Sequence, residues 1–181
     1  MCIRDSNRAN LNAAMLASMQ IGVTATEFLT AISDFSGVDK RLSLVCNDPI
    51  IYRDFAHAPS KVKATVLAVR ERYAQSNILA VLELHTYSSL NAEFIPQYMS
   101  TLDAADQAIV FYDPEVVANK RLPPISIDFI ASCFNHANIT VIDQVVDLES
   151  KLNSVKGNYE IYLLMSSGNF GNVKPDELLK N

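Results

Sequence analysis

An aspartate and a histidine stand three residues apart where an apolar run meets a proline. Asp54 and His57 follow Ile50–Tyr52, and Pro59 is expected to begin a helix because proline fits the first helical turn. Ala58, the expected N-cap, has no side-chain acceptor for the first N–H groups, so an anion can bind them at the positive end of the helix dipole. The pattern favours a nucleotide or phosphate site, with a solvated surface turn as the alternative.

Two more polar clusters follow apolar runs. The first comes after Ile78–Leu82 and comprises Glu83, His85, Thr86, Tyr87, Ser88 and Ser89. The second comes after Ile161–Met165 and comprises Ser166, Ser167, Gly168, Asn169 and Gly171. Continuous apolar runs are typical of parallel strands buried on both faces, whose carboxyl ends meet at one edge of the sheet. We therefore expect the three clusters to share a cleft, in which His85 is a candidate general base and Gly168-x-x-Gly171 a candidate phosphate loop.

Arg41 is the remaining candidate, because it follows a glycine turn at Gly37 and could clamp a phosphate or simply be solvated. His136 lies in an Asn-rich stretch that predicts a surface turn. The sequence contains no Gly-x-x-x-x-Gly-Lys-Ser/Thr loop, no Gly-x-Gly-x-x-Gly, no Gly-x-Ser-x-Gly and no His-rich metal cluster. The residues alone thus predict a polar cleft without a metal site, and no particular reaction.

The elements that position these residues alternate between strands and helices from Ser43 onward. Strands are expected at Leu44–Cys46, Ile50–Tyr52, Ile78–Leu84, Ala108–Tyr112, Ile139–Ile142 and Glu160–Met165. Helices are expected from Pro59 to about Tyr73 and at Ala92–Ser100, Ser126–Phe134, Gln144–Asn153 and Pro175–Lys180. The alternation predicts an α/β fold with a Rossmann-like, mostly parallel sheet covered by helices on both faces.

The region before the sheet predicts two helices without strands. One covers Arg8 to Gln20 and ends near Gly22; the other is capped by Thr24 or Thr26. Two short helices are too small for a domain, so we interpret residues 7–43 as a stub of a missing domain, residues 44–181 as the Rossmann-like domain and residues 1–6 as an extraneous start.

Composition excludes several classes of protein. The chain has 181 residues, 49% apolar and 19% charged, with a net charge of −5 and no Lys/Arg run, which argues against nucleic acid and anionic membranes as partners. There is no membrane-length apolar segment and no signal-peptide pattern. The three cysteines are far apart and lack Cys-x-x-Cys spacing, as expected of reduced thiols in a cytoplasmic protein.

In order along the chain, these segments resemble motifs of the Mur ligase family, the ATP-dependent amide-forming enzymes of peptidoglycan assembly. Residues 7–14 (NRANLNAA) are similar to the family's H-N-x-x-N-x-x-A-A helix, with Ser6 in place of its His. Residues 35–42 (FSGVDKRL) resemble the F-x-G-v-x-R-R-l hinge, and residues 54–59 (DFAHAP) resemble D-Y-A-H-x-P, which opens the C-terminal domain. The resemblance covers about residues 7–181 and implies that residues 7–43 end the central ATPase domain.

The resemblance extends to two branches of the family, which differ in the acceptor that they join to UDP-N-acetylmuramate. Residues 83–89 (ELHTYSS) lie where members that add L-alanine carry P-H-R-Y-S-R, but Thr86 and Ser89 replace both arginines and Leu84 replaces the proline. Residues 165–171 (MSSGNFG) look more like the M-S-N-G-x-F-G of murein-peptide ligases. The resemblance thus implies a ligase joining L-alanyl-γ-D-glutamyl-meso-diaminopimelate to UDP-N-acetylmuramate, with L-alanine as the alternative acceptor.

The resemblance also implies residue roles. ATP would convert the muramoyl carboxylate to an acyl phosphate, which the peptide amine attacks. Nucleotide contacts would come from Asn7, Asn10, Arg41, Asp54 and His57, with Asn10 at adenine, Asp54 at ribose and Arg41 at a phosphate, and with Arg41 and His57 as catalytic groups. Contacts to the incoming peptide would come from His85, Thr86, Tyr87, Ser88, Ser166, Ser167, Gly168 and Asn169.

The family's P-loop, Mg²⁺ ligands and UDP-sugar domain would all lie before Asn7. We therefore expect this chain alone to be inactive in ligation and to need the N-terminal and central domains of the same protein as partners. The alternative from a different class is a non-catalytic module that binds a nucleotide or muropeptide. An apolar stripe at Leu11, Met15 and Met19 favours the fragment, because a stripe on an isolated helix needs a partner domain to cover it.

Overall fold

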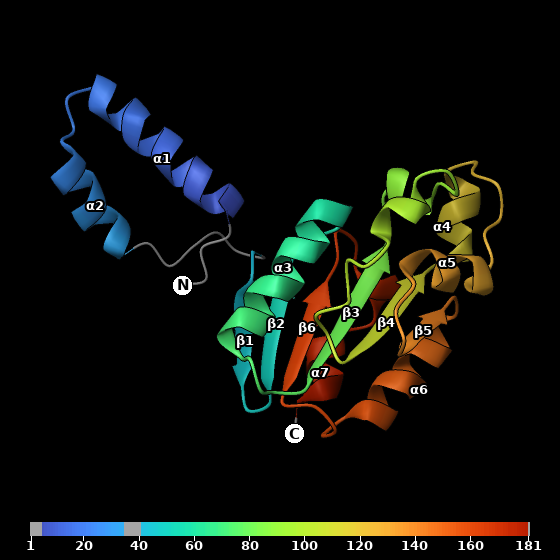
Figure 1. The fold of residues 1–181 in the computed structure, drawn as a ribbon. Helices are drawn as coiled ribbons and strands as arrows, with labels where there is room; N and C mark the ends of the chain where they lie inside the picture. The colour runs from blue at the N-terminus through green and yellow to red at the C-terminus, as the bar shows by residue number, and fades with distance from the viewer. Residues whose placement is uncertain (1–4, 35–40, 181) are drawn as a thin grey trace. The chain divides into compact units, whose positions relative to one another are not determined.

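The computed structural model describes residues 5–34 and 41–180, with side chains from Arg8 onward (Figure 1). The chain divides into two compact units, Met1–Asp39 and Lys40–Asn181. The F-x-G-v-x-R-R-l-like segment lies largely outside the described residues, which resume at Arg41. No helix of the described part is long and apolar enough to cross a bilayer.

The first unit contains helices α1 (Asp5–Gln20) and α2 (Ala25–Ser33). Gly22, with φ of +93°, follows the end of α1, as glycine does at many helix C-termini. Thr24 caps α2 in a capping box: its hydroxyl accepts the Glu27 N–H at 3.3 Å, and Glu27 Oε2 accepts the Thr24 N–H at 2.9 Å. None of residues 8–34 is buried, so the two helices form no core of their own.

The second unit is built on a six-stranded sheet in the order β1-β2-β6-β3-β4-β5. Its strands are β1 (Ser43–Asn47), β2 (Ile50–Asp54), β3 (Ile78–Leu84), β4 (Gln107–Tyr112), β5 (Ile139–Ile142) and β6 (Ile161–Met165). All neighbours pair in parallel except β1 and β2, which form an antiparallel pair. The predicted mostly parallel α/β sheet and all six predicted strands are confirmed.

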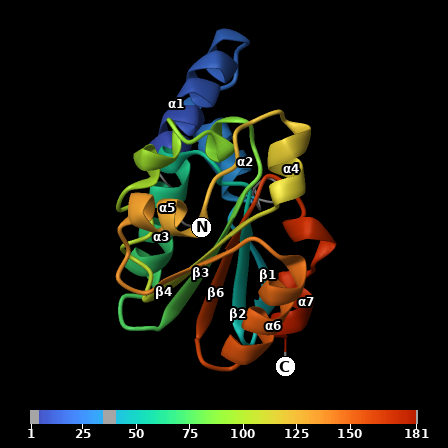
Figure 2. The same ribbon diagram turned by 90° about the vertical axis from the view of Figure 1, so that its right-hand side faces the viewer.

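Helices cover both faces of this sheet (Figures 1 and 2). On one face, α3 (Pro59–Arg72) and α5 (Ile127–Phe134) pack on side chains such as Leu82 and Val110. On the other face, α6 (Val145–Val155) and α7 (Pro175–Leu179) pack on residues such as Leu164. All seven residues of β3 are buried, as expected for a strand with helices above and below it.

Two sequence-based expectations about helices are corrected. The helix predicted at Ala92–Ser100 is instead a loop with the 3₁₀ turns η1 (Ser88–Leu90) and η2 (Ile95–Tyr98). Pro96 has no N–H for a helical ladder, and the Asn91 side chain accepts the Glu93 N–H at 2.8 Å, which favours a turn there. A short helix that was not predicted, α4 (Pro114–Asn119), follows β4 and is capped by Asp113, a pattern visible in its Asp-Pro sequence.

An ion pair ties the C-terminal end of α3 to the amino edge of the sheet. Arg70 lies 2.6 Å from Asp106 Oδ2 and also donates to the carbonyls of Ala104 and Ser76. Asp106 Oδ2 accepts the Ile78 N–H at 2.7 Å. Burial alone would raise the pKa of Asp106, but the Ile78 hydrogen bond and the Arg70 interactions outweigh it and lower that pKa from its ordinary 3.8.

A left-handed turn carries the chain from β6 toward α7. Phe170, Gly171 and Asn172 have φ of +53°, +63° and +69° in succession, inside the turn η3 (Phe170–Asn172). A Cβ on Gly171 would lie 2.6 Å from Val145 Cγ2 at the start of α6 and 3.4 Å from Phe111 Cζ. Glycine at this position is therefore needed for both the backbone conformation and the close packing.

Replacing Gly171 by Ala should lower the free energy of unfolding by roughly 2–5 kcal/mol, because it adds left-handed strain to an overpacked contact. Gly157→Ala is the matched control: its φ is +76° and a Cβ there meets no atom within 4 Å. That control should lose only the backbone part, roughly 1–2 kcal/mol. Urea unfolding of the two variants measures the difference, and equal losses would refute the packing argument.

Asp106→Asn should destabilise the protein only where the native carboxylate is charged. Since the folded-state pKa lies below the ordinary 3.8, the stabilisation is full above that value and is lost as the pH falls through the folded-state pKa. The side chain is 45% exposed, so the expected loss at neutral pH is only about 0.5–1 kcal/mol. Unfolding curves between neutral pH and acid test this, with exposed Asp103→Asn as the control; a loss that persists in acid would contradict it.

Candidate functional site

The three predicted clusters lie at the carboxyl ends of three adjacent strands, β2, β6 and β3. Met165 at the end of β6 is in register with Asp54 on β2 and with Leu82 on β3. The Ser166 N–H then donates to the Asp54 carbonyl at 3.1 Å, which joins the cluster after β6 to the turn after β2. The edge predicted from sequence is thus formed by the expected strands.

The turn after β2 holds Asp54 and His57 by local hydrogen bonds. Asp54 is 5% exposed, and its Oδ1 accepts the Ala56 N–H at 2.7 Å. Ala58 caps α3 without a side-chain hydrogen bond and Pro59 follows it, as predicted. The N-terminus of α3, where the Lys61 N–H donates to the Ala58 carbonyl at 2.9 Å, therefore begins five residues after Asp54.

His57 is half-buried beside an exposed aromatic ring. Its Nδ1 lies 2.8 Å from the Phe55 carbonyl, and its ring meets the Phe55 ring edge-on with centroids 5.2 Å apart. Phe55 is 45% exposed, so the pair offers an aromatic surface to a ligand. The hydroxyl of Tyr98 in η2 donates to the His57 carbonyl and so holds the backbone of this turn. Burial raises the pKa of the Tyr98 hydroxyl.

The cluster after β3 uses two of its hydroxyls to build its own turn. Thr86 Oγ1 accepts the Ser89 N–H at 3.1 Å and donates to Ser89 Oγ at 2.9 Å, and Ser89 is fully buried. Tyr87 and Ser88 are exposed, and the His85 side chain is 35% exposed. The groups that this turn presents to solvent are therefore His85, Tyr87 and Ser88, while Thr86 is engaged within it.

The loop after β6 is fastened to β3 by a buried carboxylate. Glu83 is 2% exposed, and its Oε2 accepts the Ser166 hydroxyl and, at 2.9 Å, the Phe170 N–H. Ser166 Oγ in turn accepts the Gly168 N–H at 2.7 Å. Gly168 and Asn169 are exposed at the tip of this loop.

Glu83 is the residue that sequence reasoning undervalued. It was grouped with the polar residues after β3 but given no role of its own. The structure places it inside β3, with its Oε1 3.6 Å from His85 Nδ1. The available sequence feature was a single acid within the otherwise apolar stretch Ile78–Leu84, since a carboxylate is seldom buried in a strand without partners.

The other predicted residues belong to different parts of the chain. Asn7 and Asn10 lie in α1 of the first unit, where Asn10 is exposed. Arg41 is exposed at the start of the second unit. The described residues contain no group of three or more His, Cys, Asp or Glu side chains that could hold a metal ion.

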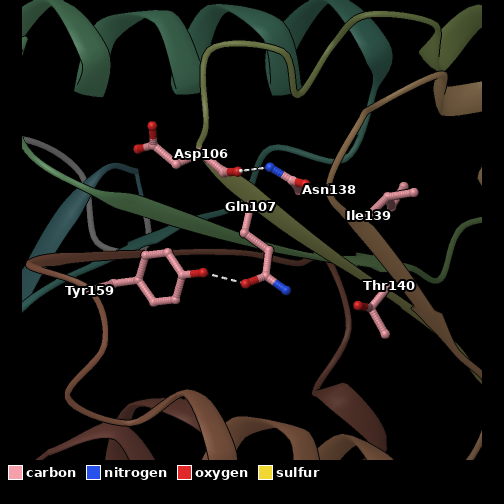
Figure 3. Close-up of a pocket in the computed structure, with 6 residues that line it drawn as sticks. All are labelled: Asp106, Gln107, Asn138, Ile139, Thr140 and Tyr159. Atoms are coloured by element: carbon pink, nitrogen blue, oxygen red, sulfur yellow. Dashed lines mark hydrogen bonds between the residues drawn. The ribbon is translucent and has the colours of Figure 1, made fainter.

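A shallow polar hollow of about 290 Å³ lies at the opposite, amino edge of the sheet (Figure 3). Its lining residues are Asp106, Gln107, Asn138, Ile139, Thr140 and Tyr159. Its polar groups bind one another: the Tyr159 hydroxyl donates to Gln107 Oε1, and Asn138 Nδ2 donates to the Asp106 carbonyl at 3.1 Å. The hollow lies at the edge opposite the three polar clusters, whereas ligands of parallel α/β sheets bind at the carboxyl ends of the strands.

Known proteins resemble the chain in sequence and in fold, although no model of a protein family matches it. A UDP-N-acetylmuramate–L-alanine ligase of Mycobacterium ulcerans is 34% identical over 137 residues, which cover 73% of this chain and 27% of that protein. The UDP-N-acetylmuramate–alanine ligase structure of Thermotoga maritima matches 97% of this chain and 37% of its own, with a TM-score of 0.72 at 16% identity.

A third match is a crystal structure of a single domain from Haemophilus ducreyi, assigned to a UDP-N-acetylmuramate:L-alanyl-γ-D-glutamyl-meso-diaminopimelate ligase. It is 26% identical, with a TM-score of 0.54, and the match covers 77% of this chain and 97% of that domain. The chain spans about a quarter to a third of the length of the curated relatives it matches. On these sequence and fold similarities, the chain belongs to the Mur ligase family and matches the C-terminal domain of its members.

Proposed function

We propose that this chain is the C-terminal part of an ATP-dependent ligase that joins a cell-wall peptide to UDP-N-acetylmuramate in the cytoplasm. In the proposed reaction, the muramoyl carboxylate attacks the γ-phosphorus of ATP and releases ADP. The peptide α-amine then attacks the acyl phosphate, an amide bond forms and inorganic phosphate leaves. The observation that carries the proposal is the meeting of Asp54, His57 and the Glu83-anchored loop at one carboxyl edge, in a chain 34% identical over 137 residues to a UDP-N-acetylmuramate–L-alanine ligase.

The side chains at the three strand ends differ in chemistry, so we assign the end of β2 to the nucleotide and the ends of β3 and β6 to the peptide. The Asp54 carboxylate suits ribose hydroxyls, which can donate to it, and His57 at the N-terminus of α3 suits a phosphate. The loops His85–Ser89 and Ser166–Asn169 suit the peptide, because both expose polar groups at the same edge of the sheet and the second loop lies directly beside the Asp54 turn. Asn7, Asn10 and Arg41 complete the proposed nucleotide contacts from the preceding segment, with Arg41 opposing phosphate charge and His57 at the nucleotide side as the proposed catalytic groups.

We propose that residues 7–43 end a central ATPase domain, and that residues 1–6 do not belong to it. Leu16, Met19 and Leu29 are 52%, 45% and 55% exposed, which leaves apolar surface for the rest of such a domain to cover. The phosphate-binding loop and Mg²⁺ ligands would belong to the preceding part of the whole protein. The chain alone is accordingly expected to be inactive in ligation.

The tripeptide L-alanyl-γ-D-glutamyl-meso-diaminopimelate is the proposed acceptor. Thr86 and Ser89 bind each other across a turn where L-alanine-adding members carry arginines, so the turn offers no guanidinium there. The domain with 26% identity is named for the tripeptide ligase. L-alanine is the second candidate, because the curated relatives at 34–40% identity are named for it.

The first test is ligation by the whole gene product with ATP, Mg²⁺ and UDP-N-acetylmuramate, with tripeptide and L-alanine supplied in parallel. Phosphate release with tripeptide alone is the expected result. Release with L-alanine alone would select the second candidate. A folded protein that binds nucleotide but releases phosphate with neither acceptor would contradict the ligase and favour a binding module.

His57→Ala in the whole gene product should raise the KM for ATP roughly tenfold, the size of a lost hydrogen bond to a charged group. Its side chain is half-buried, so the fold should be little affected. His136→Ala is the matched control, because His136 bonds the Ala105 carbonyl near the amino edge. An equal effect of both substitutions on the KM would show that His57 has no special place at the nucleotide.

A further inference from the structure

The turn Phe170–Asn172 and the exposed tip before it are held partly by their own hydrogen bonds, such as the one from the Asn172 N–H to the Asn169 carbonyl at 3.0 Å, and partly from outside. Three consecutive residues have left-handed φ values, and only one of them is glycine. Within the described chain, Ser167 Oγ is buried and has no hydrogen-bond partner. Backbone of this kind keeps one arrangement only where the surrounding structure determines it.

Glu83 supplies that support from the neighbouring strand. One carboxylate oxygen accepts the Ser166 hydroxyl at the first end of the tip and the Phe170 N–H at its second end. The Ser166 hydroxyl oxygen in turn accepts the Gly168 N–H, so Gly168 is also linked to Glu83 through Ser166. Ser166 and Phe170, the two ends of the tip, are thus held by a single atom of a side chain that is 3% exposed.

The tip is also fitted against His85. A Cβ on Gly168 would lie 2.7 Å from both Cγ and Nδ1 of His85 and 2.8 Å from Glu83 Oε2. The Gly168 backbone thus lies so close to the imidazole that there is no room for a side chain between them. Glu83 consequently fixes the relative positions of two loops that the proposed function places at the acceptor.

We propose that Glu83 is a positioning residue for the acceptor: it acts through the Ser166–Phe170 loop and His85 and does not itself touch the substrate. This inference rests on the proposed ligase function. What the loop requires is a hydrogen-bond acceptor oxygen at the position of Glu83 Oε2, because the Ser166 hydroxyl and the Phe170 N–H both donate to that atom.

Three substitutions separate position from charge. Glu83→Gln keeps an oxygen at the same reach without the negative charge, and its amide oxygen can accept both hydrogens. Glu83→Asp keeps the charge but is one methylene shorter, so its oxygen withdraws from the loop. Glu83→Leu removes the acceptor while leaving apolar volume. Leu82→Ala, at the adjacent fully buried position facing the other side of the sheet, is the control for general destabilisation.

The experiment measures two things for each variant. Hydrogen exchange of the Gly168 and Phe170 amides is followed in the 181-residue chain, and the KM values for acceptor and ATP are measured in the whole gene product. We expect Glu83→Gln to resemble the wild type. Glu83→Asp and Glu83→Leu should exchange faster and raise the acceptor KM roughly 10- to 100-fold, with the KM for ATP unchanged.

Several results would overturn the inference. Full retention by Asp with loss by Gln would assign Glu83 an electrostatic role, and an unchanged acceptor KM in all three variants would assign it none. An equal effect of Leu82→Ala on the acceptor KM would reduce the result to lost stability. A wild-type protein without ligase activity would overturn the proposed function and this inference together, whereas a failure confined to Glu83 leaves the wild type active.

Discussion

The insertion of β6 between β2 and β3 is the constraint on which the rest of the structure depends. Ile161 begins β6 in register with Ile50 on one side and with Ile78 on the other, so this strand joins the N-terminal pair β1-β2 to the group β3-β4-β5. Without it, β2 and β3 would each expose an unpaired edge. Because β6 lies in the middle, its carboxyl end sits between the Asp54 turn and the His85 turn, and the loop that follows must contact both.

This order along the chain also affects folding. The two halves of the sheet are separate in sequence until residues 161–165 are available, and the pairing of β2 with β6 joins residues more than a hundred positions apart. Long-range parallel pairing of this kind is slow, since the closure of a long loop precedes the gain from contacts. Until it forms, the apolar edges of β2 and β3 are exposed to pairing with other chains.

Most of the fold was predictable because burial on both faces leaves a direct trace in sequence: the runs around Leu82, Val110 and Leu163 are strands as expected. Pro59 and Thr24 marked helix starts by chemistry that acts within a few residues. The loop at residues 92–100 was wrongly predicted as a helix, because the spacing of its apolar residues does not reveal that Pro96 and the Asn91 side chain break the ladder. The meeting of the clusters at one edge was predictable from strand order, but the Glu83 contacts were not, since they join residues 83 positions apart or more.

The attachment of the loop after β6 to Glu83 affects which substitutions this loop can tolerate. Its two ends, Ser166 and Phe170, are held by Glu83, and of the three residues between them Gly168 and Asn169 are exposed while Ser167 is half-buried. Substitution at Asn169 therefore alters what the loop presents to solvent, and it also removes the hydrogen bond that the Asn169 side chain donates to Asn172 Oδ1 at 2.7 Å. Because that hydrogen bond lies outside the sheet and the helices, the groups that this loop presents can change at a limited cost in stability, by laboratory selection as well as in nature.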